Sequence, residues 1–343
     1  MNTLLQQLTE AVGVSGDEKE VRLLIRDLIQ EHVDSWHVDP MGNLIAHKKG
    51  TGASPLKVLV DAHMDEIGLI LIEADSYGTF RFEGVGGLDD RVLLGKVVQV
   101  GPKKLPGVIG ARPVHLLKGG QYTKVVERDS MRIDIGASSK DNALGKAKPG
   151  ERATFLSTYE EWGDVAVGKA FDDRAGCAIL IELLRGERFP FDFYASFTVQ
   201  EELGLRGAIT ASAAIQPDVA IALDCTPAYD LPNKNDESPN VRLGAGPALY
   251  VMDSGTIQDP RLVRHFLKTA EAHDIPVQIR RPGAGGTNAG SLQRAAGGTA
   301  VLSVSVPGRY LHSPHTMINL QDFAHTRQLV DTALRELVWK INA

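Results

Sequence analysis

The sequence predicts an α/β protein with a mostly parallel central sheet flanked by helices, into which a small all-β domain is inserted. Strand-like and helix-like segments follow one another from residue 169 onward, which is typical of a sheet that is parallel at its centre. Between residues 67 and 163, short β-rich pieces are separated by glycine turns, without a convincing amphipathic helix. Because the α/β pattern resumes afterwards, the β-rich stretch is interpreted as an insertion.

The N-terminal part is predicted to be helical and then to enter the sheet. Residues 1–35 have a helical pattern, and Ser15 and Glu18 have the spacing of a capping box. Residues 44–47 predict a short strand, and the apolar run 56–62 predicts a central strand covered on both faces. The apolar residues on one face of the N-terminal helix are Val21, Leu24, Ile25, Leu28 and Ile29.

The insertion is expected to form a small barrel or sandwich. This divides the chain into an α/β domain of residues 1–66 plus 164–343 and an inserted β-barrel-like domain of residues 67–163. The strands expected in the insertion are 67–72, 79–82, 96–100, 107–111, 131–135 and 152–156. Beyond it, the expected helices are 173–184, 207–214, 259–273 and 320–341, and the expected strands are 193–199, 219–223, 277–279 and 300–306.

Composition excludes several classes of function. Of 343 residues 43% are hydrophobic, enough for a large core, and the net charge of −6 comes without a basic patch, so no nucleic-acid partner is expected. Cys177 and Cys225 lie in apolar surroundings, which favours reduced thiols and a cytoplasmic location. No signal-peptide pattern and no run of 18 apolar residues is present, so neither secretion nor a membrane span is predicted.

Potential metal ligands recur where the predicted strands end. In an open α/β sheet, ligands bind at the carboxyl ends of the strands. Carboxylates and imidazoles gathered at that edge suit zinc, cobalt or manganese. These residues are His63, Glu201, Glu202 and Asp224 at strand ends, His312 one loop beyond a strand, and Asp172 and Asp173 just before a helix.

Each of these residues also has a simpler explanation. Asp172 and Asp173 could cap the helix that follows, which accounts fully for one of them but not obviously for both. Asp224 could start a turn before a proline. His312 and His315 could both be loop residues, and spacing alone does not choose between them. The hypothesis of a metal site depends on several strands ending in the same way.

Two pairs of residues indicate separate roles in metal binding, in orienting a ligand and in proton transfer. Asp65 follows His63 by two positions, so in an extended chain both side chains point to the same side, and the carboxylate can hold the second imidazole nitrogen. Glu66 is given no role. Glu201 and Glu202 are adjacent and would leave an extended chain on opposite sides. One can bind metal while the other moves a proton from the attacking water to a leaving amine.

Five segments together resemble peptidase family forty-two, the tetrahedral (TET) metallo-aminopeptidases. The family includes glutamyl and deblocking aminopeptidases, and some relatives carry the name endoglucanase. The order and spacing of the segments are more specific than any one of them, and the resemblance runs from the first helix to the last. The segments are AHMDEIG at 62–68, GKAFDDR at 168–174, QEELGLRGA at 200–208, LD at 223–224 and RYLHS at 309–313.

The resemblance implies a role for each matching residue. Two divalent ions, zinc or cobalt, are expected, with the peptide bond between Asp172 and Asp173 in the cis form and His312 preferred to His315. The inserted domain is expected to form dimers, and six dimers a hollow tetrahedral dodecamer. The implied metal ligands are His63, Asp172 as the bridge, Glu202, Asp224 and His312, with Glu201 as general acid/base and Asp65 orienting His63.

The chain departs from the family at one loop. Residues 285–288 read Gly-Gly-Thr-Asn where many relatives have Gly-Gly-Thr-Asp. The asparagine removes a charge near the expected substrate pocket, which bears on specificity rather than on the metal site. Arg280, Arg281 and Arg309 could favour acidic substrates or belong to a solvated basic surface.

The function predicted from these observations is the metal-dependent removal of N-terminal residues from short peptides. A deacylase or carboxypeptidase with the same metal chemistry is the alternative. A glycoside hydrolase is disfavoured, because that chemistry usually needs carboxylates about 5–9.5 Å apart across the scissile bond, and Glu201 and Glu202 are neighbours. A scaffold without activity is disfavoured by the presence of every expected ligand type.

Overall fold

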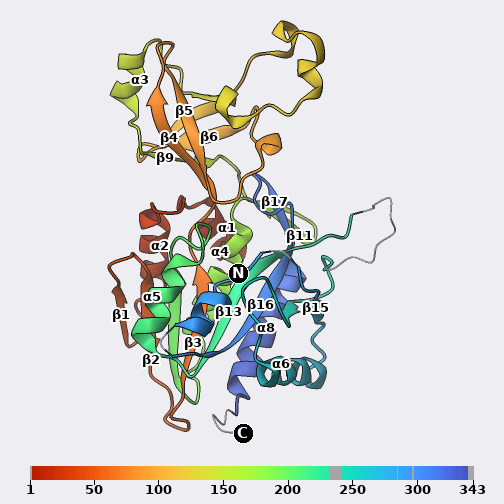
Figure 1. Ribbon diagram of the computed structural model, residues 1–343. Helices are drawn as coiled ribbons and strands as arrows, with labels where there is room; N and C mark the ends of the chain where they lie inside the picture. Colours follow the sequence, from red (N-terminus) through yellow and green to blue (C-terminus); the bar gives the residue numbers. More distant parts are fainter. Residues whose placement is uncertain (1, 232–240, 284, 296, 339–343) are drawn as a thin grey trace.

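The computed structural model describes residues 2–231, 241–283, 285–295 and 297–338. It confirms the predicted α/β class with an inserted all-β part, which stands above the α/β part in Figure 1. Within the described residues, no helix is both long and apolar enough to cross a membrane.

The α/β part is built on one large sheet. Its four central strands, β12, β3, β13 and β16, are parallel to one another, while the strands outside them are mostly antiparallel. In spatial order the strands are β1 (Ser35–Val38), β2 (Leu44–Lys48), β12 (Asp192–Thr198), β3 (Lys57–His63), β13 (Val219–Pro227), β16 (Ala300–Arg309), β17 (Thr316–Asn319), β11 (Val165–Gly168) and β10 (Glu160–Trp162), with β14 (Ala248–Tyr250) between β16 and β15 (Gln278–Arg280).

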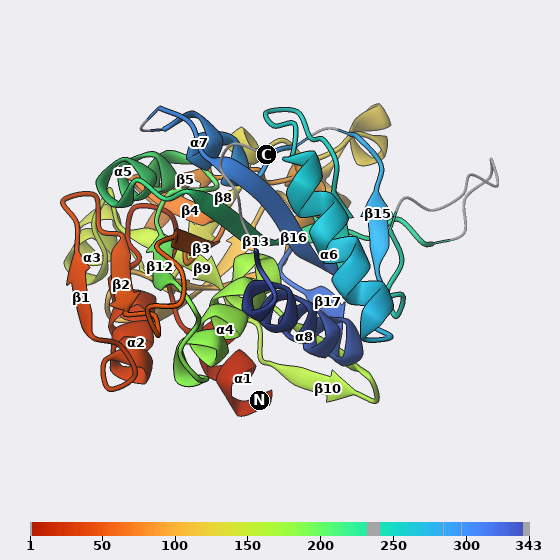
Figure 2. The same cartoon turned by 90° about the horizontal axis from the view of Figure 1, so that it is seen from below.

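Helices cover both faces of this sheet, as Figure 2 shows. One face carries α1 (Asn2–Glu10), α2 (Lys19–Ile29), α4 (Phe171–Arg185), α6 (Pro260–Ala272) and α8 (Leu320–Arg335); the other carries α5 (Arg206–Ile215) and α7 (Ala289–Arg294). Burial on both faces explains why the central strands are apolar along nearly their whole length.

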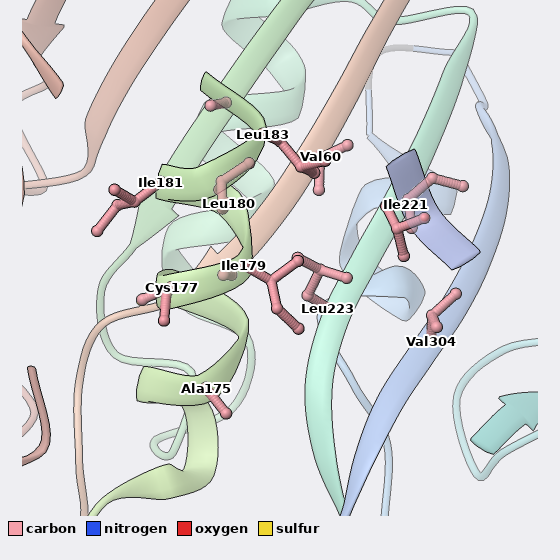
Figure 3. Packing of buried hydrophobic residues seen from close by; sticks show 14 of the residues in the cluster. Val60, Ala175, Cys177, Ile179, Leu180, Ile181, Leu183, Ile221, Leu223 and Val304 are labelled. Atoms are coloured by element: carbon pink, nitrogen blue, oxygen red, sulfur yellow. The ribbon is translucent and has the colours of Figure 1, made fainter. Parts of the chain in front are cut away.

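Helix α4 is the centre of the larger core. In Figure 3 its Leu180 lies beside Val60 of β3 and its Ile179 beside Leu223 of β13, while Val304 of β16 lies beyond β13 in the same core. All are at most 2% exposed, and burying each such side chain contributes about 1.5–3 kcal/mol. This packing fixes the first turn of α4 against the carboxyl ends of the strands, where the predicted ligands are.

The insertion is a closed six-stranded barrel with its own core, which includes Phe80, Phe82 and Ile133. Short turns of 3₁₀ helix and one α-helix, which we did not predict, connect its strands. The strands are β4 (Gly68–Ala74), β5 (Thr79–Val85), β8 (Arg132–Asp134), β7 (Leu105–Gly110), β6 (Val97–Val100) and β9 (Arg152–Phe155); the helices are η1 (Asp90–Val92), η2 (Val114–Leu116), η3 (Gly119–Thr123), η4 (Arg128–Ser130) and α3 (Lys140–Lys146).

Two predictions about the ends of helices were wrong. The capping box does not form: α2 begins at Lys19, no side chain caps it, and the Ser15 hydroxyl instead donates to Asp65. Helix α8 ends at Arg335, whereas the pattern predicted a helix up to residue 341. Residues 339–341 of that prediction lie outside the described residues.

Candidate metal centre

The carboxyl ends of the central strands bring the predicted ligands together. His63 is the last residue of β3, and Asp224 lies inside β13, the neighbouring parallel strand. Asp224 was expected to end its strand, but β13 continues to Pro227 because it pairs with β16 along its whole length, from Val219 opposite Ala300 to Pro227 opposite Gly308. His312 follows the end of β16, and Asp172 lies at the start of α4.

Asp172 lies between the two histidines. Its Oδ1 is 3.1 Å from Nε2 of His63, and its Oδ2 is 3.5 Å from Nε2 of His312. Glu202 lies on the His312 side, with Oε2 3.3 Å from Nε2 of that ring. On the other side, Nε2 of His63 is 3.9 Å from Oδ1 of Asp224. One carboxylate thus faces both halves of the cluster with different oxygens.

The donor atoms form two groups whose chemistry fits divalent cations. In each group the atoms lie within 4.8 Å of one another, and each group contains one imidazole nitrogen and two carboxylate oxygens. Imidazole and carboxylate are ligands that zinc and cobalt accept. The groups are His63 with Glu201 and Asp224, and Asp172 with Glu202 and His312.

Both imidazoles are held in the tautomer that directs Nε2 into the cluster. The Nδ1–H of His63 donates to the backbone carbonyl of Asp65 at 3.2 Å, and the Nδ1–H of His312 donates to the carbonyl of Gly87 at 2.9 Å. Because a carbonyl only accepts, Nδ1 carries a proton, and Nε2 is the nitrogen that would bind a cation once its own proton is lost.

The Asp65 carboxylate also holds the turn that carries the two glutamates. It lies 3.4 Å from Nδ1 of His63 and accepts from the backbone N–H groups of Glu201 and Glu202 at 3.0 and 3.2 Å. The hydroxyl of Ser15 donates to it at 2.6 Å. Asp65 therefore links the end of β3 to the residues after β12.

Glu201 and Glu202 do not sit in extended chain, contrary to the prediction. Strand β12 ends at Thr198, Gln200 has a left-handed φ of 55°, and the glutamates lie in the turn that follows. Both carboxylates therefore point into the same cavity. Glu201 is directed toward His63, with 4.0 Å between Oε2 and Nε2, whereas Glu202 is directed toward the other histidine.

The two pairs that the spacing left open occupy different places. The Asp172–Asp173 peptide bond is cis. Oδ1 of Asp173 accepts from the backbone N–H of Gly176 at 2.9 Å, so this residue caps the helix while Asp172 faces the cluster. His315 lies outside the cluster, with Nδ1 3.0 Å from the hydroxyl oxygen of Ser157.

A buried charge network beside the cluster was not predicted. Glu66, considered a possible surface charge, is only 2% exposed and binds the ammonium group of Lys169 at 2.7 and 2.9 Å. Arg174 lies 3.7 Å from the same carboxylate and donates to the backbone carbonyl of Met64. The position of both cations beside the Asp-Asp pair was the only hint of this network in the sequence. Glu66 and Met64, with which they interact, lie about a hundred residues earlier in the chain.

Asn288 lies beneath the wall of the pocket rather than in it. The residue is 2% exposed, and its Nδ2 donates to Asp61 at 2.7 Å and to Thr198 at 2.9 Å. Asp61 is fully buried on β3, so the amide supplies the N–H donors that an aspartate would lack. Gly285 and Gly286 of the same loop do line the pocket.

Burial and mutual repulsion raise the pKa of three carboxyl groups in this crowded site. Burial is the main cause that raises the pKa of Glu201 to about 8 and that of Glu202 to about 7, and the negative charge of Asp172 adds to both. Burial, followed by the charges of Asp172 and Glu201, raises the pKa of Asp224 well above its usual range. Bound cations would relieve this repulsion.

The pKa values of both histidines are also raised, although burial opposes the shift. Burial lowers the pKa of His312, but a hydrogen bond to Asp172 and the charge of Glu202 outweigh it and raise the pKa to about 9. Burial likewise opposes, and Glu201, Asp172 and Asp65 together produce, a pKa of His63 well above its usual range. The cluster attracts positive charge strongly, as a site for divalent cations must.

A pocket of about 340 Å³ opens directly onto this cluster. Its walls include Tyr250, Arg280 and Leu311 in addition to residues of both donor groups. An α/β sheet with clustered metal ligands at its carboxyl edge and an adjoining pocket defines a metal-dependent hydrolase.

Comparison with known proteins identifies the class more closely. The M42 glutamyl aminopeptidase family model matches residues 42–329. A putative aminopeptidase of Acetivibrio thermocellus is 38% identical over 335 residues, which cover 97% of this chain and 98% of the relative. Aminopeptidase APDkam598 of Desulfurococcus kamchatkensis has a TM-score of 0.92 at 35% identity, covering 98% and 94% of the two chains. The TET1 peptidase of Pyrococcus horikoshii, which can assemble into a tetrahedron or a large octahedral shell, has a TM-score of 0.87 at 34% identity, covering 98% of this chain and 99% of that chain.

The chain belongs to the M42 glutamyl aminopeptidase family, as its motifs predicted. It is a metal-dependent aminopeptidase. The deacylase, carboxypeptidase, glycoside hydrolase and scaffold alternatives are not favoured by these relatives.

Proposed function

We propose that the protein removes N-terminal residues from short peptides at a site for two metal ions. His63 and Asp224 would hold one ion, Glu202 and His312 would hold the other, and Asp172 would serve both. The observation that carries this proposal is the placement of Asp172, whose two oxygens face the two histidines at 3.1 and 3.5 Å. When bound, the ions polarise the scissile carbonyl and lower the pKa of the attacking water.

Glu201 is proposed as the group that moves the proton. Its carboxylate faces the cluster from the turn after β12, with Oε2 4.0 Å from Nε2 of His63. It lines the pocket, so it can accept the proton of the water and deliver it to the leaving amine. Asp65 is proposed as a positioning residue, because its carboxylate accepts hydrogen bonds from the backbone N–H groups of Glu201 and Glu202.

Hydrolysis of a free and an N-acetylated amino-acid anilide tests this function. We expect the free anilide to be cleaved by cobalt- or zinc-loaded protein, the acetylated one to resist, and a chelator to abolish cleavage reversibly. Equal release of aniline from the acetylated anilide would show that no free N-terminus is required and would contradict an aminopeptidase. Turnover that survives complete metal removal would contradict the proposed site.

Arg280 is proposed to select acidic N-terminal residues. It is 7% exposed, lines the catalytic pocket and stacks on Tyr250, with 4.6 Å between the guanidinium carbon and the ring centre. It is thus no part of a solvated basic surface. Arg309 is paired with Asp230 at 2.6 and 2.7 Å and is not among the residues that line this pocket.

The Arg280→Met variant is expected to lose selectivity for acidic substrates. A guanidinium facing a carboxylate in a partly desolvated pocket contributes about 1.5–3 kcal/mol. We therefore expect the ratio of kcat/KM for glutamyl anilide over leucyl anilide to fall about 10- to 100-fold. Arg309→Met is the matched control and should leave the ratio unchanged. A ratio that is the same in wild type and Arg280→Met would refute the assignment.

The barrel is proposed to mediate self-association. Three apolar side chains, Val97, Val108 and Leu156, lie side by side on β6, β7 and the end of β9, and are 41%, 46% and 48% exposed. We call them the barrel patch. The assembly of the Pyrococcus horikoshii relative into closed shells supports a second copy of this chain as the occupant, and a tetrahedral dodecamer as the assembly.

Charging the barrel patch is expected to reduce the mass of the assembly. Val108→Lys would bury an ammonium group between copies, whereas Tyr77→Lys, at the 82% exposed tip of the β4–β5 turn, places the same charge elsewhere on the barrel. Sedimentation should show a smaller species for Val108→Lys only. A wild-type protein that sediments as a 37.0 kDa monomer would contradict the proposal.

A further inference from the structure

A second cleft adjoins the catalytic pocket at His312. It has a volume of about 720 Å³ and shares Leu311 and His312 with the pocket. One wall comes from residues 87–96 of the barrel, and the other from residues 310–315 after β16. An aminopeptidase substrate has a single residue before the scissile bond and all the others after it, so the site needs a second space of this kind.

The barrel wall of the cleft lies directly against the cluster. The carbonyl of Gly87 accepts from His312, and a Cβ on Gly87 would be only 3.0 Å from Nδ1 of that ring. A Cβ on Gly86 would be 3.2 Å from the Cβ of Glu202. Two residues without side chains thus bring the barrel backbone close to the ligands, and the cleft begins where the reaction occurs.

The charge of the cleft comes from the barrel. Arg91 is paired with the Asp89 carboxylate through both Nε and Nη2, so this pair is neutral. His315 is held by Ser157. Lys96, half-buried just before β6, has no side-chain hydrogen bond or ion pair among the described residues. A single uncompensated ammonium group therefore faces the cleft.

We propose that this cleft binds the part of the peptide that follows the scissile bond, and that Lys96 binds a carboxylate there. The inference rests on the proposed aminopeptidase function. The carboxylate is either the C-terminus of a di- or tripeptide or an acidic side chain. The inserted barrel then contributes directly to substrate binding.

Matched peptides with the same N-terminal residue test this role. The set is a tripeptide with a free C-terminus, its C-terminal amide, an amide with glutamate after the scissile bond, and the anilide, which has no such residues. Wild type should prefer the anionic peptides over the neutral amide about 2- to 5-fold through KM, the range of one solvent-accessible ion pair. Lys96→Gln should remove that preference and leave anilide hydrolysis unchanged.

Lys103→Gln, which removes the same charge beyond the other end of β6, is the control and should retain the preference. A preference for the free C-terminus or for the glutamate amide supports the proposal and identifies the carboxylate. Equal KM values for all peptides in wild type would overturn it, as would a Lys96→Gln effect that extends to the anilide. Failure of wild type to cleave even the anilide would instead refute the proposed function.

Discussion

The Glu201→Gln variant is expected to lose about 10²–10⁴-fold in kcat, the usual contribution of general acid/base catalysis. The amide has nearly the shape of the carboxylate but cannot accept the proton of the attacking water. Because we propose other residues as the bridging and terminal ligands, the variant should bind as many metal ions as wild type. Steady-state kinetics and elemental analysis of the same sample measure both quantities.

A surface glutamate provides the control for this substitution. Glu182 on α4 pairs loosely with Arg185 at 3.5 Å, so Glu182→Gln should keep wild-type kcat and metal content. Because Glu201 also lies within ligand distance of His63 and Asp224, the metal count is informative. Retained turnover would exclude Glu201 as the proton carrier, and loss of one ion would make it a ligand instead.

The second large effect is expected at the bridge. Asp172→Asn should weaken binding of both ions and abolish measurable hydrolysis, because one side chain faces His63 and His312 through different oxygens. Removing a carboxylate charge that faces both ion sites should lower metal affinity more than removing a ligand of one ion. Cobalt binding followed by absorption spectroscopy, together with near-ultraviolet circular dichroism for folding, measures this.

Asp173→Asn is the adjacent control. Burial raises the pKa of Asp173 well above its usual range. An amide has nearly the same shape as this side chain, and its oxygen can still accept from the N–H of Gly176. The variant should retain both ions. If Asp173→Asn loses both ions while Asp172→Asn keeps them, the bridge has been assigned to the wrong residue.

Features whose interactions lie close together in the sequence, or follow from a general rule of topology, could be predicted from the sequence. Apolar runs ending in His63 or Glu201 predicted strands whose ends meet, since one topology rule places them at one edge. Ser15 matched a capping box, but its partner Asp65 is fifty residues away and competes for the same hydroxyl. A motif within a few residues of Ser15 cannot indicate that a distant carboxylate binds its hydroxyl.

Other residues show the same limit. Asn288 is a loop residue by its neighbours, yet its partner Asp61 lies 227 positions earlier, and only the fold brings a buried carboxylate to it. Helix α3 has two turns, too few for a periodic pattern to be visible. Roles within the cluster came from the family resemblance, and the geometry adds which oxygen of Asp172 faces which histidine.

Metal stoichiometry tests the central claim most directly. Protein freed of metal with a chelator would be titrated with cobalt while bound metal and glutamyl anilide hydrolysis are measured together. A site with one ligand set around His63, another around His312 and Asp172 between them predicts two ions per chain, with full activity only when both are bound. Full activity at one ion per chain, or activity without any bound ion, would contradict it.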